Sequence, residues 1–347
     1  MTYKITLMPT GHHFHCEADE TILAAALRQH VNLEYGCRRG VCGKCIGTLL
    51  EGTVHYNDKI RAAEKCDPKK NHTVYCSAIP TTDLVIESTL IDTPDNTVFK
   101  TTAVITRTPC KVVTLNKLCH DVIQMIIKLP DAINPQFKAG QYLDFLVPDG
   151  TRRSFSIANA PRVDKHIELH IRHVAGGEYT AYIFNKMQAG EILRIELPLG
   201  SFYLREKSTR PIIMMGGGTG FAPLKGMIEA AIKKNVTRPI HLFWGVRAER
   251  DIYLSKLPQQ WLKQLQNFRF TAVLSAPDSD NEINQPWRGE TGFVHHSVLA
   301  AYPTLDQVDL YMSGPPIMIE TARDAFIAAG LAQQYMYSDA FEYNAHP

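Results

Sequence analysis

Four cysteines carry the strongest chemical signal in this sequence of 347 residues. Cys37, Cys42 and Cys45 lie in one short loop, and Cys76 follows much later in the chain. Four residues separate the first pair and two the second, which is the spacing of the thiolate ligands of a [2Fe–2S] cluster. Glycines between the cysteines allow the loop to direct backbone N–H groups at the sulfur atoms. We therefore predict a [2Fe–2S] centre, which transfers single electrons.

The same cysteines allow two other interpretations, a zinc site or disulfides. Structural zinc sites usually combine two short cysteine pairs, whereas the second element here is a single cysteine. Cys66 is a competing fourth ligand, but the charged stretch around it, residues 64–70, predicts a solvated turn. The cysteines outside the predicted cluster, Cys16, Cys66, Cys110 and Cys119, are expected to be reduced structural thiols.

A second candidate site is the run Arg153-Ser154-Phe155-Ser156. An arginine, an aromatic ring and a hydroxyl group on one strand offer a phosphate clamp, a stacking surface and a hydrogen-bond donor. The Gly176-Gly177 turn before Thr180 is able to begin a helix whose N-terminal amides hold a pyrophosphate. The alternative is structural, with Phe155 in a core and Arg153 on the surface.

A third candidate site is the glycine run Gly216–Gly220. It lies between a strand-like segment, residues 211–215, and a predicted helix, residues 222–234, with another strand-like run at 240–244. This order predicts a parallel sheet, and a glycine turn at a helix start suits a dinucleotide pyrophosphate.

Another turn, Ser313-Gly314-Pro315-Pro316, follows the strand-like run 308–312. Open α/β sheets bind ligands at the C-terminal ends of their strands, so this turn is also a candidate binding segment. By itself it is equally compatible with a rigid turn.

Hydrophobic patterns divide the chain into three predicted domains. Residues 1–92 alternate strand-like runs with one helical segment around Thr21–His30, and the polar, proline-containing stretch 91–97 predicts a linker. Residues 101–205 show short alternating runs typical of an antiparallel barrel or sandwich. Residues 209–347 contain the predicted parallel sheet. The fold class is therefore multi-domain, α+β followed by α/β.

Composition excludes several partner classes. The formal net charge is +2, with 45% hydrophobic and 21% charged residues, so nothing indicates binding to nucleic acid or to a membrane surface. No apolar run approaches 18 residues, and Met1–Lys4 does not open a signal peptide. We expect a cytoplasmic protein.

These segments, in this order, resemble the ferredoxin–NADP reductase superfamily. Arg153–Ser156 is similar to its R-x-[YF]-S flavin motif, and Gly140–Tyr142 and Gly177–Thr180 are similar to segments of its barrel. Gly218–Pro223 resembles its nucleotide-phosphate turn and Ser313–Pro316 its C-G-P-P segment. The family usually has cysteine at the position of Ser313, which puts the rate of hydride transfer in question.

A ferredoxin-type domain ahead of that pair resembles the reductase components of bacterial oxygenases, of the benzoate dioxygenase and phenol hydroxylase type. The segments Arg152–Pro161 and Tyr337–Phe341 are most similar to CDP-6-deoxy-Δ3,4-glucoseen reductases, which deliver electrons to a deoxysugar dehydratase. The resemblance implies a β-grasp ferredoxin domain, an antiparallel β-barrel that binds FAD, and a parallel-sheet domain that binds NADH or NADPH.

The resemblance also implies an activity, in which electrons pass from NADH through FAD and a [2Fe–2S] cluster to a separate dehydratase or oxygenase. Ser156, Ser313 and Phe341 are the implied catalytic residues. The implied cofactor-binding residues are Arg153, Ser154, Phe155, Ser156, His170, Ile171, Arg172, Gly177, Thr180, Gly218, Thr219, Gly220, Arg247, Gly314, Pro315 and Phe341. A different class of function, an electron carrier or redox-sensing module, stays open.

The choice between the two nicotinamide cofactors depends on one loop. Arg247 and Arg250 are able to hold a 2′-phosphate, whereas Glu249 or Asp251 is able to accept a ribose hydroxyl. The loop therefore offers both signs of charge. Because the family's oxygenase reductases mostly use NADH, we expect NADH.

Charge around the cluster predicts how an acceptor docks. Residues 1–95 contain ten Lys and Arg against twelve Asp and Glu, but Arg38, Arg39 and Lys44 all lie in the ligand loop. Distant exposed charges are screened beyond about 8 Å at physiological salt, so the local charge dominates. We expect an acceptor with an acidic or mixed docking face.

Overall fold

The computed structural model describes residues 1–31, 33–57, 60–88, 104–134, 136–277, 287 and 289–340. The chain divides into two compact units, each described here by itself. The first contains the described residues up to Ile105 together with Pro198–Ser201, and the second contains Thr106–Leu197 and the described residues from Phe202 on. The predicted linker at 91–97 and Phe341 lie outside the described residues. None of the helices in the described ranges is long and apolar enough to span a membrane.

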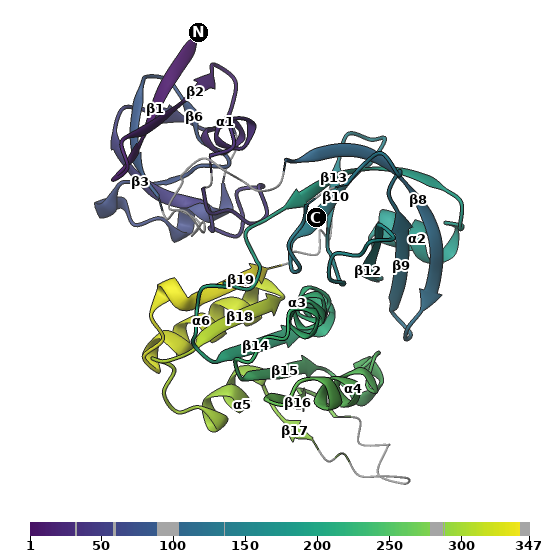
Figure 1. Ribbon diagram of the computed structural model, residues 1–347. Helices are drawn as coiled ribbons and strands as arrows, with labels where there is room; N and C mark the ends of the chain where they lie inside the picture. The colour runs from purple at the N-terminus through teal and green to yellow at the C-terminus, as the bar shows by residue number, and fades with distance from the viewer. Residues whose placement is uncertain are drawn as a thin grey trace. The chain divides into compact units, whose positions relative to one another are not determined.

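The first unit is built on a mixed five-stranded sheet with the order β2-β1-β7-β3-β5. Its β1 strand pairs antiparallel with β2 and parallel with β7, and β3 pairs antiparallel with both β7 and β5. This arrangement, with one helix after the first hairpin, is the predicted β-grasp fold (Figure 1). The elements are β1 (Thr2–Met8), β2 (His12–Glu17), α1 (Ile22–Arg28), β3 (Ile46–Glu51), β4 (Val54–His55), β5 (His72–Val74), β6 (Ile79–Pro80) and β7 (Leu84–Glu87).

Local sequence explains where the helix of this unit begins. Thr21 caps α1 by accepting a hydrogen bond from the Ala24 N–H at 3.3 Å, as expected of a threonine before an apolar run. Ile22 and Leu23 are fully or almost fully buried in the same core as Ile5 of β1. The helix therefore covers one face of the sheet and leaves the cysteine loop, which follows it, at the sheet's end.

The second unit begins with an antiparallel barrel whose strand order is β11-β10-β13-β8-β9-β12. A bridge between Ile157 and Leu169 joins the two edge strands and closes the barrel. Its interior is apolar, with Leu143, Ile127 and Leu197 fully buried. The elements are β8 (Thr106–Lys117), β9 (Val122–Lys128), β10 (Tyr142–Leu146), β11 (Arg152–Ser156), β12 (His166–Arg172), α2 (Glu178–Asn185) and β13 (Ile192–Leu199).

The rest of this unit is a six-stranded parallel sheet with the order β17-β16-β15-β14-β18-β19. Every pairing in it is parallel, as the strand–turn–helix pattern predicts. The elements are β14 (Ile212–Gly217), α3 (Phe221–Lys233), β15 (Ile240–Val246), α4 (Leu257–Gln264), β16 (Phe268–Leu274), β17 (Glu290–Thr291), α5 (Val294–Ala301), β18 (Asp309–Gly314), α6 (Pro316–Ala328) and β19 (Met336–Ala340).

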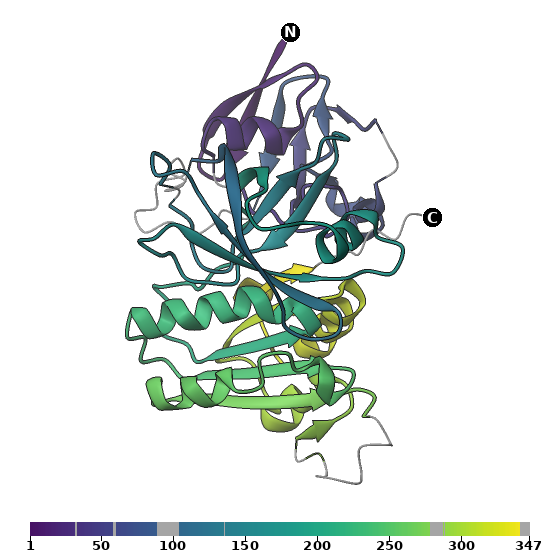
Figure 2. The same cartoon turned by 90° about the vertical axis from the view of Figure 1, so that its right-hand side faces the viewer.

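Helices cover both faces of this sheet (Figure 2). The helices α3 and α4 pack on one face, where Phe221 and Trp261 share a core with Trp244. The helices α5 and α6 pack on the other, where Val298 and Phe326 are fully buried. Because both faces are covered, the C-terminal ends of the strands are the edge at which a ligand site can form.

Candidate functional site

Backbone N–H groups in the cysteine loop point at the sulfur atoms. The Gly40 N–H donates to Cys76 Sγ at 3.2 Å, and the N–H groups of Arg39 and Cys42 each donate to Cys37 Sγ at 3.4 Å. Gly40 has a φ of 68°, a conformation that glycine adopts without strain. The loop therefore surrounds its thiols with donors, which favours thiolates and a negatively charged cluster.

The four thiols lie as two pairs. A hydrogen bond from the Cys42 thiol lowers the pKa of Cys37 to about 5, and one from Cys45 lowers the pKa of Cys76 to about 7. Among the described residues, no three of these sulfur atoms all lie within 4.8 Å of one another. A single zinc ion, about 2.3 Å from each sulfur, would bring all four closer than that. Two pairs fit a cluster with two irons better than a mononuclear zinc site.

Cys66 lies apart from these pairs. It follows the 3₁₀ helix η1 (Arg61–Lys65), its Sγ donates to the Ala62 carbonyl at 3.7 Å, and its side chain packs against the core. Most of the predicted solvated turn is exposed, at residues 64–65 and 68–70, whereas Cys66 itself is half-buried. The helical turn provides apolar contacts that the charged composition of the stretch did not reveal.

The predicted flavin motif forms strand β11, and its side chains alternate between two faces. Phe155 packs on Phe145 of the barrel interior, with 5.2 Å between ring centroids. On the other face the Ser154 hydroxyl donates to the buried Asp144 carboxylate at 2.6 Å. Ser154 thus fixes the strand, while Arg153 and Phe155 share the opposite face.

Helix α2 begins beside this strand. Its N-cap is Gly177, and the Thr180 hydroxyl donates to the Gly177 carbonyl at 3.0 Å and accepts from the Val174 N–H at 3.2 Å. Tyr179 in the first turn lies close enough to Arg153 for the guanidinium to oppose the rise that burial causes in the tyrosine pKa. The structure therefore brings Arg153 and the amides of a helix start together, the donor set that a flavin pyrophosphate needs. Thr180 organises the turn with its hydroxyl.

Replacing Arg153 with alanine should weaken flavin retention. Loss of a charge-assisted phosphate contact costs on the order of 1.5–3 kcal/mol, roughly ten- to a hundredfold in affinity. The measurement is flavin content and affinity after dilution, with Arg162→Ala as a control, because Arg162 pairs with Asp164 outside the motif at 2.9 Å. Full flavin retention in the Arg153→Ala protein would contradict the assignment.

The end of β11 meets two strands of the parallel sheet. The Ser156 hydroxyl donates to Asp339 Oδ2 of β19 at 3.2 Å, and Asp339 pairs in register with Ser313 of β18. Ser313 is fully buried, and its hydroxyl has no hydrogen-bond partner among the described residues. Buried hydroxyl groups usually have a hydrogen-bond partner, so a hydroxyl group without one is consistent with a ligand-binding site. The sequence did not single out Asp339, although it lies in the C-terminal motif, and Phe341 lies outside the described residues.

The three predicted residues of β12 have different environments. His170 is buried with both ring nitrogens engaged, to Glu168 at 2.9 Å and to Tyr253 at 3.1 Å, and Ile171 is buried in the barrel core. Their side chains therefore serve the protein interior. Arg172 differs, because its Nε donates to Asp121 at 2.7 Å and it lines the cavity at the parallel sheet.

That cavity has a volume of about 660 Å³ and lies at the C-terminal ends of the parallel strands. It brings together residues from distant predicted segments, namely Arg172, Gly218, Thr219, Arg247 and Pro315. The volume is within the range of cofactor pockets.

Glycines allow two strand ends to meet at this cavity. A Cβ on Gly220 would lie 2.0 Å from the Ser313 carbonyl oxygen, and a Cβ on Gly314 would lie 3.3 Å from the Gly217 Cα. Gly220 also leaves the start of α3 without a capping side chain. The free amides of this 13-residue helix suit a dinucleotide phosphate, so the residues fit the predicted cofactor.

The far part of the cavity contains the loop predicted to choose between the nicotinamide cofactors. Arg247 and Asp251 line the cavity, but Asp251 Oδ2 already accepts from the Ala248 N–H at 3.0 Å. Phe293 and His295, which the sequence did not single out, also line it. The preference for NADH stays a prediction.

A cysteine cluster loop, a barrel with a flavin-type strand and a dinucleotide-type sheet define an iron–sulfur flavoprotein oxidoreductase. Three family models match the chain in these places. They are a 2Fe-2S iron-sulfur cluster binding domain at residues 5–81, an oxidoreductase FAD-binding domain at 109–203 and an oxidoreductase NAD-binding domain at 214–324.

Whole-length relatives agree with this class. The chain is 36% identical to the CDP-6-deoxy-L-threo-D-glycero-4-hexulose-3-dehydrase reductase of Yersinia pestis, over 98% of this chain and 99% of that one. It is 32% identical to the phenol hydroxylase P5 protein of Acinetobacter pittii, over 98% and 95%. The chain belongs to this family of [2Fe–2S], FAD- and NAD-dependent reductases, which confirms the predicted passage of electrons from a nicotinamide cofactor through FAD and a [2Fe–2S] cluster.

Solved structures give the same fold. The Amycolatopsis cytochrome P450 reductase GcoB aligns over 98% of both chains, with a TM-score of 0.80 and 28% identity. The ferredoxin reductase in carbazole 1,9a-dioxygenase aligns over 99% of both chains, with a TM-score of 0.72 and 24% identity. The three predicted architectures are therefore confirmed as a set.

Proposed function

We propose that this chain delivers electrons from NADH to a CDP-6-deoxyhexulose dehydrase. The observation that supports this acceptor is the 36% identity, over almost the full length of both chains, to the Yersinia pestis reductase of such a dehydrase. Oxygenase reductases match over similar lengths at 31–32%. An oxygenase is therefore the second candidate acceptor.

Bound FAD would accept a hydride from the nicotinamide and release its two electrons singly to the cluster. The protein's part is to hold and orient. Arg153 and the start of α2 would hold the flavin phosphates, and the Gly218–Gly220 turn would hold those of the nicotinamide cofactor. The Ser156 hydroxyl and Asp339 carboxylate, 3.2 Å apart, form a pair that can hold one proton at the end of β11.

The acceptor is tested by reconstitution with purified components. NADH, this chain and a CDP-6-deoxyhexulose dehydrase with its sugar nucleotide should yield the reduced deoxysugar, and omission of this chain should abolish the product. A parallel reaction contains an oxygenase component and its aromatic substrate. Hydroxylated product with no deoxysugar would transfer the assignment to the second candidate. Steady reduction of cytochrome c by NADH excludes a module that only senses the cofactor.

The surface around the cysteine loop supports an acidic or mixed docking face on the acceptor. Arg39 is exposed, and η1 adds Arg61 and Lys65 beside the loop, where the Ala62 N–H donates to the Gly40 carbonyl at 2.8 Å. Lys44 contributes less than the sequence predicts, because Glu34 lies 3.5 Å from its ammonium group. Arg39 is therefore the best single position at which to test the charge.

Reversing the charge with Arg39→Glu should slow electron transfer to the acceptor and reduce its dependence on salt. Electrostatic steering acts mainly on the association rate, so the effect should be largest at low ionic strength. The measurement is the second-order rate constant against ionic strength. Lys4→Glu on β1 is the matched control, since Lys4 is exposed and lies on a strand outside the loop. Equal rates and equal salt slopes in Arg39→Glu and wild type would exclude docking through this loop.

A further inference from the structure

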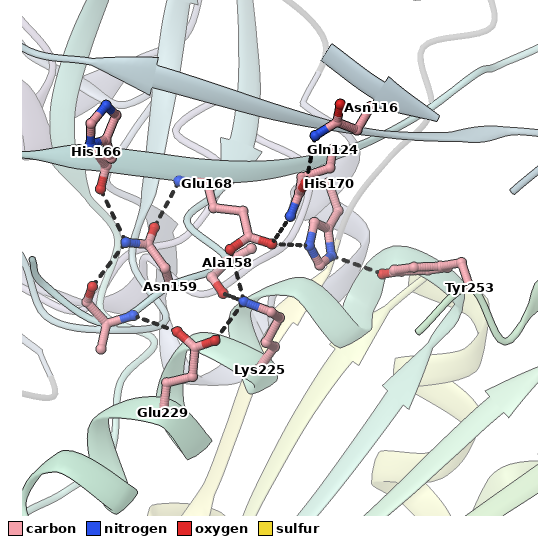
Figure 3. Close-up of polar contacts among 11 residues, drawn as sticks. Asn116, Gln124, Ala158, Asn159, His166, Glu168, His170, Lys225, Glu229 and Tyr253 are labelled. Atoms are coloured by element: carbon pink, nitrogen blue, oxygen red, sulfur yellow. Dashed lines mark hydrogen bonds and ion pairs between the residues drawn. The ribbon is translucent and has the colours of Figure 1, made fainter. Parts of the chain in front are cut away.

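Lys225 of α3 is a buried cation at the junction between the parallel-sheet region and the barrel of the second unit. Its side chain is 6% exposed. Its Nζ donates to the Ala158 carbonyl at 3.0 Å, to Glu168 Oε2 at 2.9 Å and to Glu229 Oε1 at 2.6 Å (Figure 3). An ammonium group has three N–H donors, so each has one acceptor and the side chain is held in one orientation.

Glu168 extends this contact into the barrel. Its Oε1 accepts from the Gln124 amide at 2.8 Å and lies 2.9 Å from His170 Nε2, and His170 Nδ1 lies 3.1 Å from the Tyr253 hydroxyl (Figure 3). Burial alone would raise the pKa of Glu168, but His170 and Lys225 hold it at about 2. Burial lowers the pKa of His170, and the hydrogen bond to Glu168 opposes this shift. The network is thus a charged pair with its remaining hydrogen-bonding groups satisfied.

The residue after Lys225 brings the two backbones into contact. A Cβ on Gly226 would lie 3.1 Å from the Ile157 carbonyl oxygen and 3.2 Å from both the nitrogen and the carbonyl oxygen of Asn159. At these distances the backbone must give by a few tenths of an ångström to admit a Cβ, so a side chain here would strain the contact between α3 and the segment that follows β11. Both residues therefore affect the distance between α3 and residues 157–159. Lys225 draws the two segments together through its hydrogen bonds, and Gly226 allows their backbones to approach.

The separation between α3 and the segment after β11 affects how the nucleotide-phosphate turn lies relative to the flavin-type strand. Ala158 lies two residues after Ser156, whose hydroxyl donates to Asp339, and Lys225 lies five residues after Gly220, the N-cap of α3. A shift of α3 along the barrel would move the nucleotide-phosphate turn relative to Ser156. A buried ion pair adds little stability compared with an apolar contact of the same size, whereas its directional bonds fix one geometry.

We propose that Lys225 and Gly226 are positioning residues that set the separation between the nicotinamide-binding turn and the flavin-binding strand. The inference rests on the proposed function, in which strand β11 holds the flavin through Arg153. Neither residue touches the reacting atoms. Their effect is to hold the hydride donor and acceptor at a productive distance, and a misplacement of about 1 Å can cost a hundredfold in rate.

The test compares three holoenzyme variants with wild type. Lys225→Met removes the ammonium group and keeps an unbranched side chain, and Gly226→Ala changes the spacing without changing any charge. Lys233→Met is the matched control, because Lys233 lies on the same helix, is exposed, and donates to the nearby Pro161 carbonyl at 3.1 Å. The readouts are the limiting rate of flavin reduction by NADH, the dissociation constant of NADH, and hydrogen exchange of peptides covering residues 157–161 and 221–229.

In Lys225→Met and Gly226→Ala the limiting rate of flavin reduction should fall by between about tenfold and a hundredfold. The dissociation constant of NADH should stay within about threefold, because the lost interaction acts on the reacting geometry. Hydrogen exchange at 157–161 should become faster in both variants and stay unchanged in Lys233→Met. If Lys225→Met fails to fold, Gly226→Ala alone decides.

Unchanged limiting rates in Gly226→Ala, with flavin bound, would overturn the inference. A loss of NADH affinity with an unchanged limiting rate would overturn it as well, since the residues would then serve binding. A failure of the proposed function would be distinguishable from a failure of this inference. It would appear in the wild-type protein, which would then transfer no electrons to the dehydrase. The comparison among variants needs only reduction of the flavin by NADH.

Discussion

Cys76→Ser should remove the cluster and leave the flavin. The serine oxygen replaces a thiolate of the Cys45–Cys76 pair, so an iron held by this pair would lose one of its two cysteine ligands. We expect the visible absorption and the iron content of the cluster to fall close to zero, with reduction of cytochrome c by NADH falling to background. Reduction of the flavin itself by NADH should continue within about threefold of wild type, since the barrel and the parallel sheet belong to the other compact unit of the chain.

Cys66→Ser is the control for this result, because Cys66 differs only in position. Its thiol contacts the Ala62 carbonyl and the core, so its loss should cost no iron. Iron analysis and the visible spectrum of both purified proteins decide. A Cys66→Ser protein without a cluster, beside a Cys76→Ser protein with one, would reassign the fourth ligand.

Gly220→Ala should have the largest effect on the nicotinamide site. The new methyl group would lie 2.0 Å from the carbonyl oxygen of Ser313, which belongs to a buried strand and has no room to move. Overpacking of this kind costs about 1–3 kcal/mol, and here the strain falls on the turn that binds the phosphates. We expect NADH affinity to fall about tenfold or more, with a lower Tm.

The measurement is a titration with NADH together with a thermal unfolding curve. Gly190→Ala provides a matched control, because no atom lies within 4 Å of a Cβ placed there. Gly190 has a φ of 100°, so its substitution carries backbone strain without the collision at the site. Equal NADH affinity in Gly220→Ala and wild type would show that the turn does not approach the cofactor.

Local patterns were enough to predict the elements that carry the cofactors. The cysteine spacing, the strand–glycine–helix run and the alternating strands each depend on residues close in sequence, and all correspond to observed elements. The parallel sheet and an antiparallel barrel or sandwich follow from them, whereas the β-grasp fold and the choice of a barrel came from the family resemblance. The family resemblance supplied the order in which electrons pass.

Contacts between distant segments could not be predicted in the same way. Asp339 reaches Ser156 across 183 positions, and Lys225 reaches Glu168 across 57, so no local period records either pair. His170, which the family resemblance implied as a cofactor-binding residue, has both ring nitrogens engaged in a buried network, so its ring is not available to a cofactor. The sequence alone does not show whether a polar residue in a strand faces the protein interior or a ligand, because that depends on which face of the strand is covered by packing.

The pairing of Ser156 with Asp339 also bears on domain exchange. A chimaera that takes its residues from 209 onward from a relative would keep its own Ser156 but receive a foreign residue opposite that hydroxyl. The same chimaera would retain Glu168 and lose its matching lysine unless the donor supplies one. We therefore expect a chimaera to transfer hydride when the donor relative has the same residues at the positions of Asp339, Lys225 and Gly226. A chimaera without them should fold but transfer hydride slowly.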